Sequence, residues 1–246
     1  MFTAFKKLFK TQHTTQKYYS TDLHSHLIPA IDDGSQSMEE SVELIKGLKS
    51  LGYTKLITTP HIMHHRFPNS SKTILAGLED VKAELKAQNI EIELEAAAEY
   101  YLDEHFLELL NKKEILTFGE NYLLFEMSYA QKPVNLESVI HEIKVAGYRP
   151  VLAHPERYLF MHRDFSIYEK LKEQGVLFQV NLNSFNGYYS KPVQKVVLEI
   201  LEKGWIDFIG SDTHKVKQLE YLSKNLDSKV MSKIFKKCTV LNDRIA

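Results

Sequence analysis

The chain alternates between short strand patterns and helical patterns along most of its length. Runs rich in β-branched and other apolar residues predict seven strands, at residues 21–24, 55–59, 90–96, 122–127, 149–153, 176–182 and 206–210. Amphipathic helical patterns follow them, at residues 38–51, 71–88, 103–110, 135–146, 164–174, 191–203 and beyond 216. Such alternation predicts an α/β fold, with a parallel sheet and helices outside it.

Two architectures satisfy this alternation, an open doubly wound sheet and a closed barrel. An open dinucleotide-binding sheet would carry a glycine-rich phosphate loop after its first strand, and the residues after position 24 do not provide one. No Gly/Ser/Pro-rich linker interrupts the repeating units. We therefore expect a single TIM-like barrel with seven strand–helix units, where eight are usual.

The first 20 residues differ from the rest of the chain. They carry Lys6, Lys7, Lys10 and Lys17 and no acidic residue, and they lack the apolar stretch of a secretory signal. We expect residues 1–20 to be a mobile basic leader and residues 21–246 to be the barrel domain. The alternative for the leader is a weak contact with a membrane surface or a partner, through the apolar face of a short helix.

Composition excludes several classes of protein. The formal net charge is −1, which argues against binding to long nucleic acids. No apolar run approaches the ~18 residues of a transmembrane helix, so no stable membrane insertion is expected. Cys238 is the only cysteine, so an internal disulfide is impossible and a reducing, cytoplasmic location is expected.

Histidines and carboxylates gather at the carboxyl ends of the predicted strands. These candidates are His24, His26, Asp33, His61, Glu99, Glu126, His154, Asp212 and His214. In parallel barrels the strand ends converge on one face, so the set predicts a cluster of charge that bound cations would stabilise. Nitrogen and oxygen ligands suit Mn²⁺, Zn²⁺ or Fe, and in part Mg²⁺. Nine ligands exceed the need of one ion and fit two or three.

The charge of such a centre points to a phosphate substrate. Four carboxylates would leave two of the positive charges of three divalent ions unbalanced, and a phosphate dianion matches that remainder. Clustered divalent ions are a common arrangement for phosphoryl hydrolysis, because they generate hydroxide at neutral pH and hold the phosphate oxygens.

The order of these motifs resembles a known superfamily. His24-x-His26, His61, Glu99, His154 and Asp212-x-His214 resemble the PHP (polymerase and histidinol phosphatase) superfamily. Four segments resemble one branch more closely, the manganese-dependent protein-tyrosine phosphatases of bacterial capsule and exopolysaccharide operons. They are Asp32-Asp33-Gly34, Thr59-Pro60-His61, His154-Pro155-Glu156-Arg157 and Ser211-Asp212-x-His214. The resemblance extends from about Thr21 to His214.

The resemblance implies a trinuclear site in a distorted seven-stranded barrel. One ion would be held by His24, His26, Glu99 and Asp212, with Glu99 as the candidate bridge. The other ions would be served by Asp33, His61, His214, Glu126 and His154. Arg157 would bind the substrate phosphate, and Arg157, Asp212 and His214 are the candidate catalytic residues. Such proteins use metal hydroxide to remove phosphate from an autophosphorylating tyrosine kinase that controls polysaccharide export.

The chain departs from the family pattern in two places. The leader is one of them, because many members begin almost directly at the His-x-His strand. After the last motif the family often has Asn and then Arg, whereas this chain has Lys215-Val216-Lys217-Gln218. Lys215 or Lys217 is therefore the candidate for a second phosphate-binding cation, although an ammonium group lacks the planar fork of Arg.

Other functions fit part of the same pattern. A PHP-type small-molecule phosphatase, such as one acting on histidinol phosphate, or another phosphoesterase would use a similar centre. A metal-dependent amidohydrolase also begins with His-x-His, but it often uses a modified Lys at strand four, where this chain has Glu126. A non-catalytic module with structural metals is the alternative from a different class.

Overall fold

The strands in the described part of the chain are all parallel and form two sheets. A computed structural model describes residues 18–226 and 229–245. Within them, one sheet has the strand order β1-β2-β4 and the other has the order β3-β5-β6-β7-β8-β9. The strands are β1 (Thr21–Asp22), β2 (Lys55–Thr58), β3 (His61–Ile62), β4 (Glu93–Ala96), β5 (Glu99–Tyr101), β6 (Tyr122–Glu126), β7 (Arg149–Ala153), β8 (Leu177–Asn181) and β9 (Phe208–Gly210).

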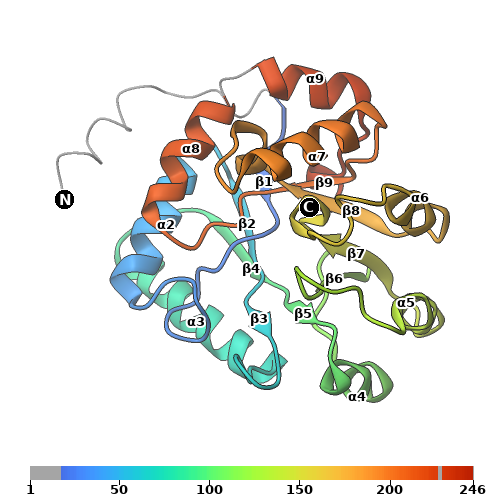
Figure 1. Cartoon of the computed structure of the whole chain (residues 1–246). Coiled ribbons are helices and arrows are strands. Elements are labelled where there is room, and N and C mark those ends of the chain that lie inside the picture. Colours follow the sequence, from blue (N-terminus) through green and yellow to red (C-terminus); the bar gives the residue numbers. More distant parts are fainter. Residues whose placement is uncertain (1–17, 227–228, 246) are drawn as a thin grey trace.

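Helices lie outside the strands and surround the two sheets (Figure 1). The α-helices are α2 (Met38–Ser50), α3 (Ser71–Ala87), α4 (Glu104–Lys112), α5 (Leu136–Val145), α6 (Ser166–Glu173), α7 (Lys191–Glu202), α8 (Val216–Leu226) and α9 (Lys229–Lys237). The short 3₁₀ helices among the described residues are η2 (Pro155–Arg157), η3 (Leu182–Asn186) and η4 (Asn242–Arg244). The predicted α/β fold with a parallel arrangement is confirmed.

Two of the seven predicted strands are each followed by a short second strand that was not predicted from the sequence, so the chain is divided there into two strands. Beyond β2 the chain passes through Thr59 and Pro60 and re-enters a sheet as β3. Pro60 has no backbone N–H to donate to a ladder, which explains why the strand breaks there. Beyond β4 the chain likewise passes through Ala97 and Ala98 and re-enters a sheet as β5. The division moves the chain from the smaller sheet to the larger one.

This division sets the register of two site residues. In the larger sheet His61 of β3 pairs directly with Glu99 of β5, and Tyr101 of β5 pairs with Glu126 of β6. Residues paired across parallel strands point to the same face. The sheet therefore places the imidazole of His61 and the carboxylate of Glu99 side by side.

The segments around the first and last strands are hydrogen-bonded to each other. The N–H of Asp212, just after β9, donates to the carbonyl of His24 at 2.7 Å. The N–H of His26 donates to the carbonyl of Thr213 at 3.0 Å. Ser211 Oγ donates to the buried carboxylate of Asp22 at 2.7 Å. These bonds hold the His24-x-His26 and Asp212-x-His214 motifs against each other.

Two buried apolar clusters support this arrangement. The larger cluster lies between helices and strands, as where Val42, Ile45 and Leu48 of α2 are buried. Helix α2 begins as predicted, because the Ser37 side chain accepts a hydrogen bond from the N–H of Glu40. The smaller cluster is built mainly from the strands and the segments that continue them, and it includes Leu23, Ile57, Leu124, Val151 and Phe208.

The predicted leader falls mostly outside the described residues, which begin at Tyr18. The end of the leader, however, packs on the rest of the protein. Tyr19 is only 3% exposed, and its hydroxyl lies 2.8 Å from that of Tyr53. The N–H of Ser20 donates to the Asp243 carboxylate. No helix in the described part of the chain combines the length and apolar character needed to cross a membrane.

Candidate functional site

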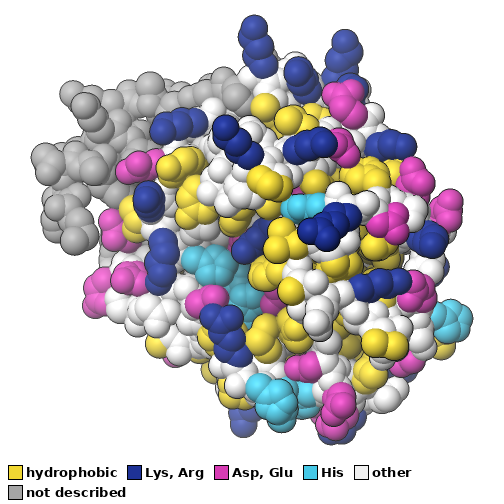
Figure 2. Space-filling view, in the orientation of Figure 1, with side chains coloured by type: hydrophobic (Ala, Val, Ile, Leu, Met, Phe, Trp, Pro, Cys, Tyr) yellow, Lys and Arg dark blue, Asp and Glu magenta, His cyan; other side chains and the backbone are white. Residues whose placement is uncertain are grey.

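A pocket of about 680 Å³ opens at the carboxyl ends of the strands. Figure 2 shows it as a hollow with histidine side chains at its floor and basic and acidic side chains beside it. Seven of the nine candidate ligands from the sequence line this pocket, namely Asp33, His61, Glu99, Glu126, His154, Asp212 and His214. His24 and His26 are fully buried beneath them.

All nine of these side chains come together in the structure. They form overlapping groups in which one possible ligand atom from each member lies within 4.8 Å of the others. The groups are His26 with Asp33, His61 and His214; His24 with Glu99 and His154; His24 with His26 and Asp212; and His61 with Glu99 and Glu126. Every group shares a member with another, so the set forms one continuous cluster.

Glu99 lies at the centre of the cluster and is fully buried. Its Oε2 atom is 3.2 Å from Nε2 of His24, 3.2 Å from Nδ1 of His61 and 3.5 Å from Nε2 of His26. Its Oε1 atom is 3.0 Å from Nε2 of His154. Burial opposes its charge, but His24 and His61 outweigh that effect and hold the pKa of Glu99 well below its usual range. An ionised carboxylate in this place could bridge two cations.

The two histidines of the first motif are each held through Nδ1. His24 Nδ1 lies 2.7 Å from Oε1 of Gln179, and His26 Nδ1 lies 2.8 Å from Oδ2 of Asp32. Both Nε2 atoms therefore face the cluster, 3.4 Å apart. A ring nitrogen held in this way fixes the orientation of the other, as is usual for metal-binding histidines.

These two adjacent histidines have opposite pKa shifts. Burial opposes the charge of His24, but Glu99 and Asp212 raise its pKa to about 9. Burial and the nearby His214 lower the pKa of His26 to about 4, against the opposing effect of Asp32. Without cations the cluster thus holds protons unevenly among crowded groups. Metal binding to such a site displaces the protons from the ligands.

The outer part of the cluster is formed by Asp33 and two histidines. Asp33 Oδ1 lies 3.4 Å from Nε2 of His61 and 3.3 Å from Nε2 of His214. The Asp33 side chain is 43% exposed, so the group faces the solvent in the pocket. Gly34 makes this position possible, because a Cβ atom there would lie 2.4 Å from Cβ of His26.

Several buried atoms of the cluster lack a hydrogen bond. Within the described residues His61 Nδ1, Glu126 Oε1 and His154 Nδ1 have no partner in hydrogen-bonding geometry, although His61 Nδ1 and Glu126 Oε1 lie 3.0 Å apart. Buried polar atoms normally find a partner, and those that do not require an explanation. A donor set of imidazole nitrogens and carboxylate oxygens with unsatisfied members fits a centre for divalent cations.

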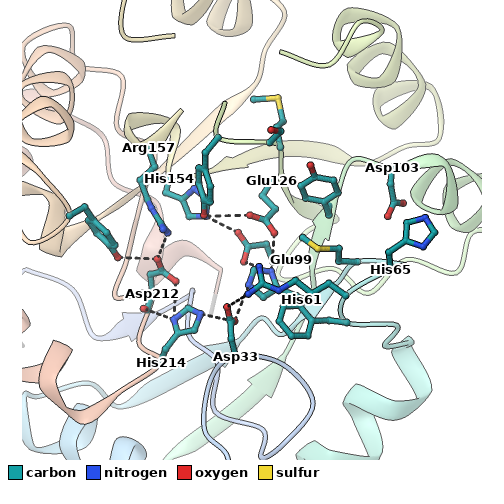
Figure 3. Close-up of a pocket in the computed structure, with 18 of the residues that line it drawn as sticks. Asp33, His61, His65, Glu99, Asp103, Glu126, His154, Arg157, Asp212 and His214 are labelled. Atoms are coloured by element: carbon teal, nitrogen blue, oxygen red, sulfur yellow. Dashed lines mark hydrogen bonds and ion pairs between the residues drawn. The ribbon is translucent and has the colours of Figure 1, made fainter. Parts of the chain in front are cut away.

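Asp212 connects this cluster to the wall of the pocket. Its Oδ2 atom accepts hydrogen bonds from Asn181 Nδ2 at 2.6 Å, Tyr189 OH at 3.0 Å and Arg157 Nη1 at 3.0 Å. Its Oδ1 atom faces the cluster, 3.6 Å from Nε2 of His24. Figure 3 shows Asp212 between Arg157 and His214. Asp212 has a φ of 51°, a strained backbone conformation of the kind often found at functional sites.

Arg157 reaches the pocket from η2, after β7. Its guanidinium pairs with Asp212, and its side chain is 24% exposed. The neighbouring Glu156 does not pair with it: Glu156 is buried and accepts hydrogen bonds from the N–H of Asn181 and Oγ of Ser184. The structure thus gives these two consecutive charged residues separate positions, one in the pocket wall and one inside the protein.

Of the two lysines predicted as phosphate-binding candidates, one lies in the pocket and the other outside it. Lys215 lines the pocket, and its Nζ atom donates to the carbonyl of Gly34 at 2.7 Å. Lys217 is exposed on α8 and is absent from the described lining of the pocket. Arg66 also lines the pocket, 3.7 Å from Asp33. Of the two lysines considered for phosphate binding, the structure places Lys215 at the site.

Sequence reasoning missed the residues that hold the candidate ligands. Asp32 accepts hydrogen bonds from His26 Nδ1 and from the N–H groups of Gly34 and His61. Gln179 bonds both His24 and Asn181. Asp32 was visible within the Asp-Asp-Gly motif, but nothing in the sequence distinguished its role from that of Asp33. Gln179 could have been noticed because it lies two residues before Asn181 and so faces the same side of β8.

Comparison with known proteins gives a consistent group of relatives. The model of the family described as capsular polysaccharide synthesis, CpsB/CapC, matches residues 20–241. A CapC protein of Staphylococcus aureus is 28% identical over 206 residues, which cover 83% of this chain and 81% of that protein. The tyrosine-protein phosphatase YwqE of Bacillus subtilis (strain 168) is 27% identical over 197 residues, 80% of this chain and 78% of that protein.

A solved structure has the same fold. It comes from crystal structures of YwqE from Bacillus subtilis and CpsB from Streptococcus pneumoniae, described as unique metal-dependent tyrosine phosphatases. The TM-score is 0.76 at 24% sequence identity, and the match covers 89% of this chain and 96% of that chain. The similarity extends over nearly all of both proteins, so the arrangement of two parallel sheets and outer helices is that of a known fold.

The hydrogen bond between Asp32 and His26 leads to a testable prediction about metal affinity. Asp32→Asn removes the negative charge that orients and polarises the His26 ring, so we expect the affinity for Mn²⁺ to fall by about 10- to 100-fold. Competition with a chelating indicator dye measures this affinity. Glu39→Gln is the control, because Glu39 is an exposed acid in the first turn of α2. Equal affinity of the folded Asp32→Asn protein and the parent would show that Asp32 does not support a metal ligand.

Proposed function

The chain belongs to the capsular polysaccharide synthesis CpsB/CapC family, and from this premise we propose that it is a metal-dependent phosphotyrosine-protein phosphatase. The family match confirms the resemblance drawn from the strand-end motifs. Relatives that cover most of this chain carry the name tyrosine-protein phosphatase. The observation that carries the proposal is the cluster of nine histidines and carboxylates around Glu99, with Arg157 at its edge.

We assign two or three divalent ions to this cluster, with Mn²⁺ as the first candidate and Zn²⁺, Fe or Mg²⁺ as alternatives. The ligands of one ion would be His24, His26, Glu99 and Asp212, and those of the others Asp33, His61, His214, Glu126 and His154. When bound, such ions supply a hydroxide nucleophile at neutral pH and offset the charge of the phosphate.

The side chains of the protein supply binding and orientation. Asp212 holds Nη1 of Arg157 through one oxygen, which leaves other N–H groups of the guanidinium for phosphate oxygens. A guanidinium placed there also meets the negative charge that develops in the transition state. Beside it, Tyr129, Tyr189 and Phe67 line the pocket and provide apolar surface for an aromatic substrate. The leaving phenolate has a pKa near ~10, so it needs little help from a general acid.

We further propose that the two sheets are parts of one distorted seven-stranded barrel of PHP type. Backbone hydrogen bonds support it where the strands divide, from the N–H of Ala97 to the carbonyl of Thr58 and from the N–H of Glu99 to the carbonyl of Pro60. The bridge between Ser25 and Thr213 joins the segments that follow the first and last strands. In this proposal residues 21–246 are one domain and residues 1–20 are a basic leader.

The substrate we propose is phosphotyrosine on a protein, in particular an autophosphorylating tyrosine kinase of polysaccharide export in the cytoplasm. The description of the family as capsular polysaccharide synthesis and the names of the relatives support this substrate. The alternative is a PHP-type small-molecule phosphatase, such as one acting on histidinol phosphate, and direct comparison of substrates separates the two.

Removal of metal tests the proposed function. We expect the Mn²⁺-loaded protein to hydrolyse a phosphotyrosine peptide faster than histidinol phosphate, and exhaustive chelation to abolish this activity until Mn²⁺ is restored. Cys238→Ser should keep full activity, because Cys238 is buried, lies outside the pocket lining and has a pKa that burial raises. Steady-state phosphate release measures each case. Activity that survived chelation but was lost in Cys238→Ser would overturn the proposal, and preference for histidinol phosphate would favour the alternative.

Substitution of Arg157 tests its assigned role. Arg157→Ala removes a group that stabilises phosphate charge, so we expect kcat/KM on a phosphotyrosine peptide to fall by roughly two to three powers of ten. Arg157→Lys should restore only part of the activity, because it cannot bind two oxygens in a plane. Metal content, measured on the same samples, should not change.

Arg149→Ala is the matched control for this experiment. Arg149 is also an arginine near an end of β7 that lies over a tyrosine ring, 4.2 Å from the centroid of Tyr122, but it is outside the pocket. We expect it to retain parental kinetics. An Arg157→Ala protein within about twofold of the parent would make Arg157 structural and Lys215 the better candidate for phosphate binding.

A further inference from the structure

The guanidinium of Arg157 is in contact with two tyrosine rings. Its Cζ atom lies 4.7 Å from the ring centroid of Tyr129 and 4.5 Å from that of Tyr189. Both rings thus lie within contact distance of the same guanidinium. Contact between a guanidinium and an aromatic ring is favourable, and more so where water is excluded. The geometry therefore restrains a side chain that would otherwise have many rotamers.

Each ring is held in place independently of Arg157. Tyr129 lies in the loop after β6, where its ring contacts those of His154 and Tyr158, with centroids 5.6 and 5.7 Å away. Its carbonyl also accepts a hydrogen bond from the N–H of Leu159 at 2.8 Å. These contacts all come from the segment that follows β7, and His154 among them is a candidate ligand, so the ring is supported on the side of the cluster.

Tyr189 lies later in the chain, between η3 and α7, and is anchored through its hydroxyl group. Its hydroxyl donates to Oδ2 of Asp212 and accepts from Nδ2 of Asn181, both at 3.0 Å. The same Asp212 oxygen accepts from Nη1 of Arg157. Tyr189 is thus linked to Arg157 in two ways. Its ring contacts the guanidinium, and its hydroxyl donates to the same Asp212 oxygen as Arg157 does.

From these contacts we propose that Tyr129 and Tyr189 are positioning residues that clamp the Arg157 guanidinium for phosphate binding. This inference rests on the proposed function, in which Arg157 binds the phosphate. Both rings contact the guanidinium and Asp212 takes Nη1, so the remaining N–H groups are the ones left for an anion in the pocket. An ammonium group lacks the planar fork of a guanidinium, which favours an arginine over a lysine at this position.

Direct binding of inorganic phosphate tests the clamp without requiring turnover. Isothermal titration of the Mn²⁺-loaded protein with inorganic phosphate gives Kd for each variant. We expect Tyr189→Leu to weaken binding by about tenfold and Tyr129→Leu by about threefold to fivefold, within the range of cation–π contacts. Tyr189→Phe keeps the ring and loses only the hydroxyl that bonds Asp212, so it should weaken phosphate binding less than Tyr189→Leu does. Metal content is measured on every sample.

Double substitutions distinguish positioning through Arg157 from a general structural effect. In an Arg157→Ala background, Tyr189→Leu and Tyr129→Leu should cause no further loss, because their effect passes through the guanidinium. Tyr221→Leu is the control: Tyr221 packs on Tyr188, with centroids 4.8 Å apart, but is not part of the described pocket lining. It should leave the Kd for phosphate unchanged.

The clamp is wrong if both ring deletions leave phosphate binding unchanged, or if they weaken it equally with and without Arg157. Failure of the parent protein to bind phosphate would overturn it as well. If Tyr189→Leu does not fold, Tyr129→Leu carries the same test, because Tyr129 is 37% exposed and lies in a loop. Phosphate binding that follows the expected pattern without hydrolysis of a phosphotyrosine peptide would refute the proposed function and leave the clamp intact.

Discussion

The contact on which the site depends is that of one buried carboxylate, Glu99, with four imidazole groups. Its two oxygens lie 3.0 to 3.5 Å from nitrogens of His24, His26, His61 and His154. A buried carboxylate is costly unless it is paired, so the histidines and the acid depend on one another. The fold meets this demand because β3 and β5 pair His61 with Glu99 and because β9 holds the first motif beside the last. The remaining hydrogen bonds of His24 and His26 then fix which nitrogen faces the centre.

Asp212 gives this centre its connection to a substrate. One of its oxygens faces the histidines, and the other accepts three hydrogen bonds from the wall of the pocket. Arg157 is among these donors, so the group proposed to bind phosphate is aligned by a group proposed to bind metal. Such coupling places a cation for the phosphate oxygens next to the candidate metal ligands before the substrate arrives, and this preorganisation is what electrostatic catalysis requires.

The sequence predicted most of the helices and the residues of the candidate site, but not the hydrogen bonds that hold those residues in place. Alternating patterns predicted the helices and the parallel arrangement, because periodicity reports which face of an element is buried. Convergence of strand ends predicted that residues as distant as His24 and Asp212 would meet. The strand β3 was not foreseen, because the predicted strand ended at residue 59, just before Pro60. The roles of Asp32, Gln179 and Tyr189 depend on which atoms meet across distant elements, and periodicity carries no such information.

The central claim is that the nine clustered side chains hold divalent ions. Anomalous diffraction from crystals of the protein grown with Mn²⁺, with data collected on both sides of the manganese absorption edge, tests it most directly. The account predicts two or three manganese peaks around Glu99, each at a coordination distance of about 2.0–2.3 Å from side-chain atoms of the cluster. Crystals with fully occupied manganese elsewhere and none within reach of Glu99, His24 and His61 would contradict it.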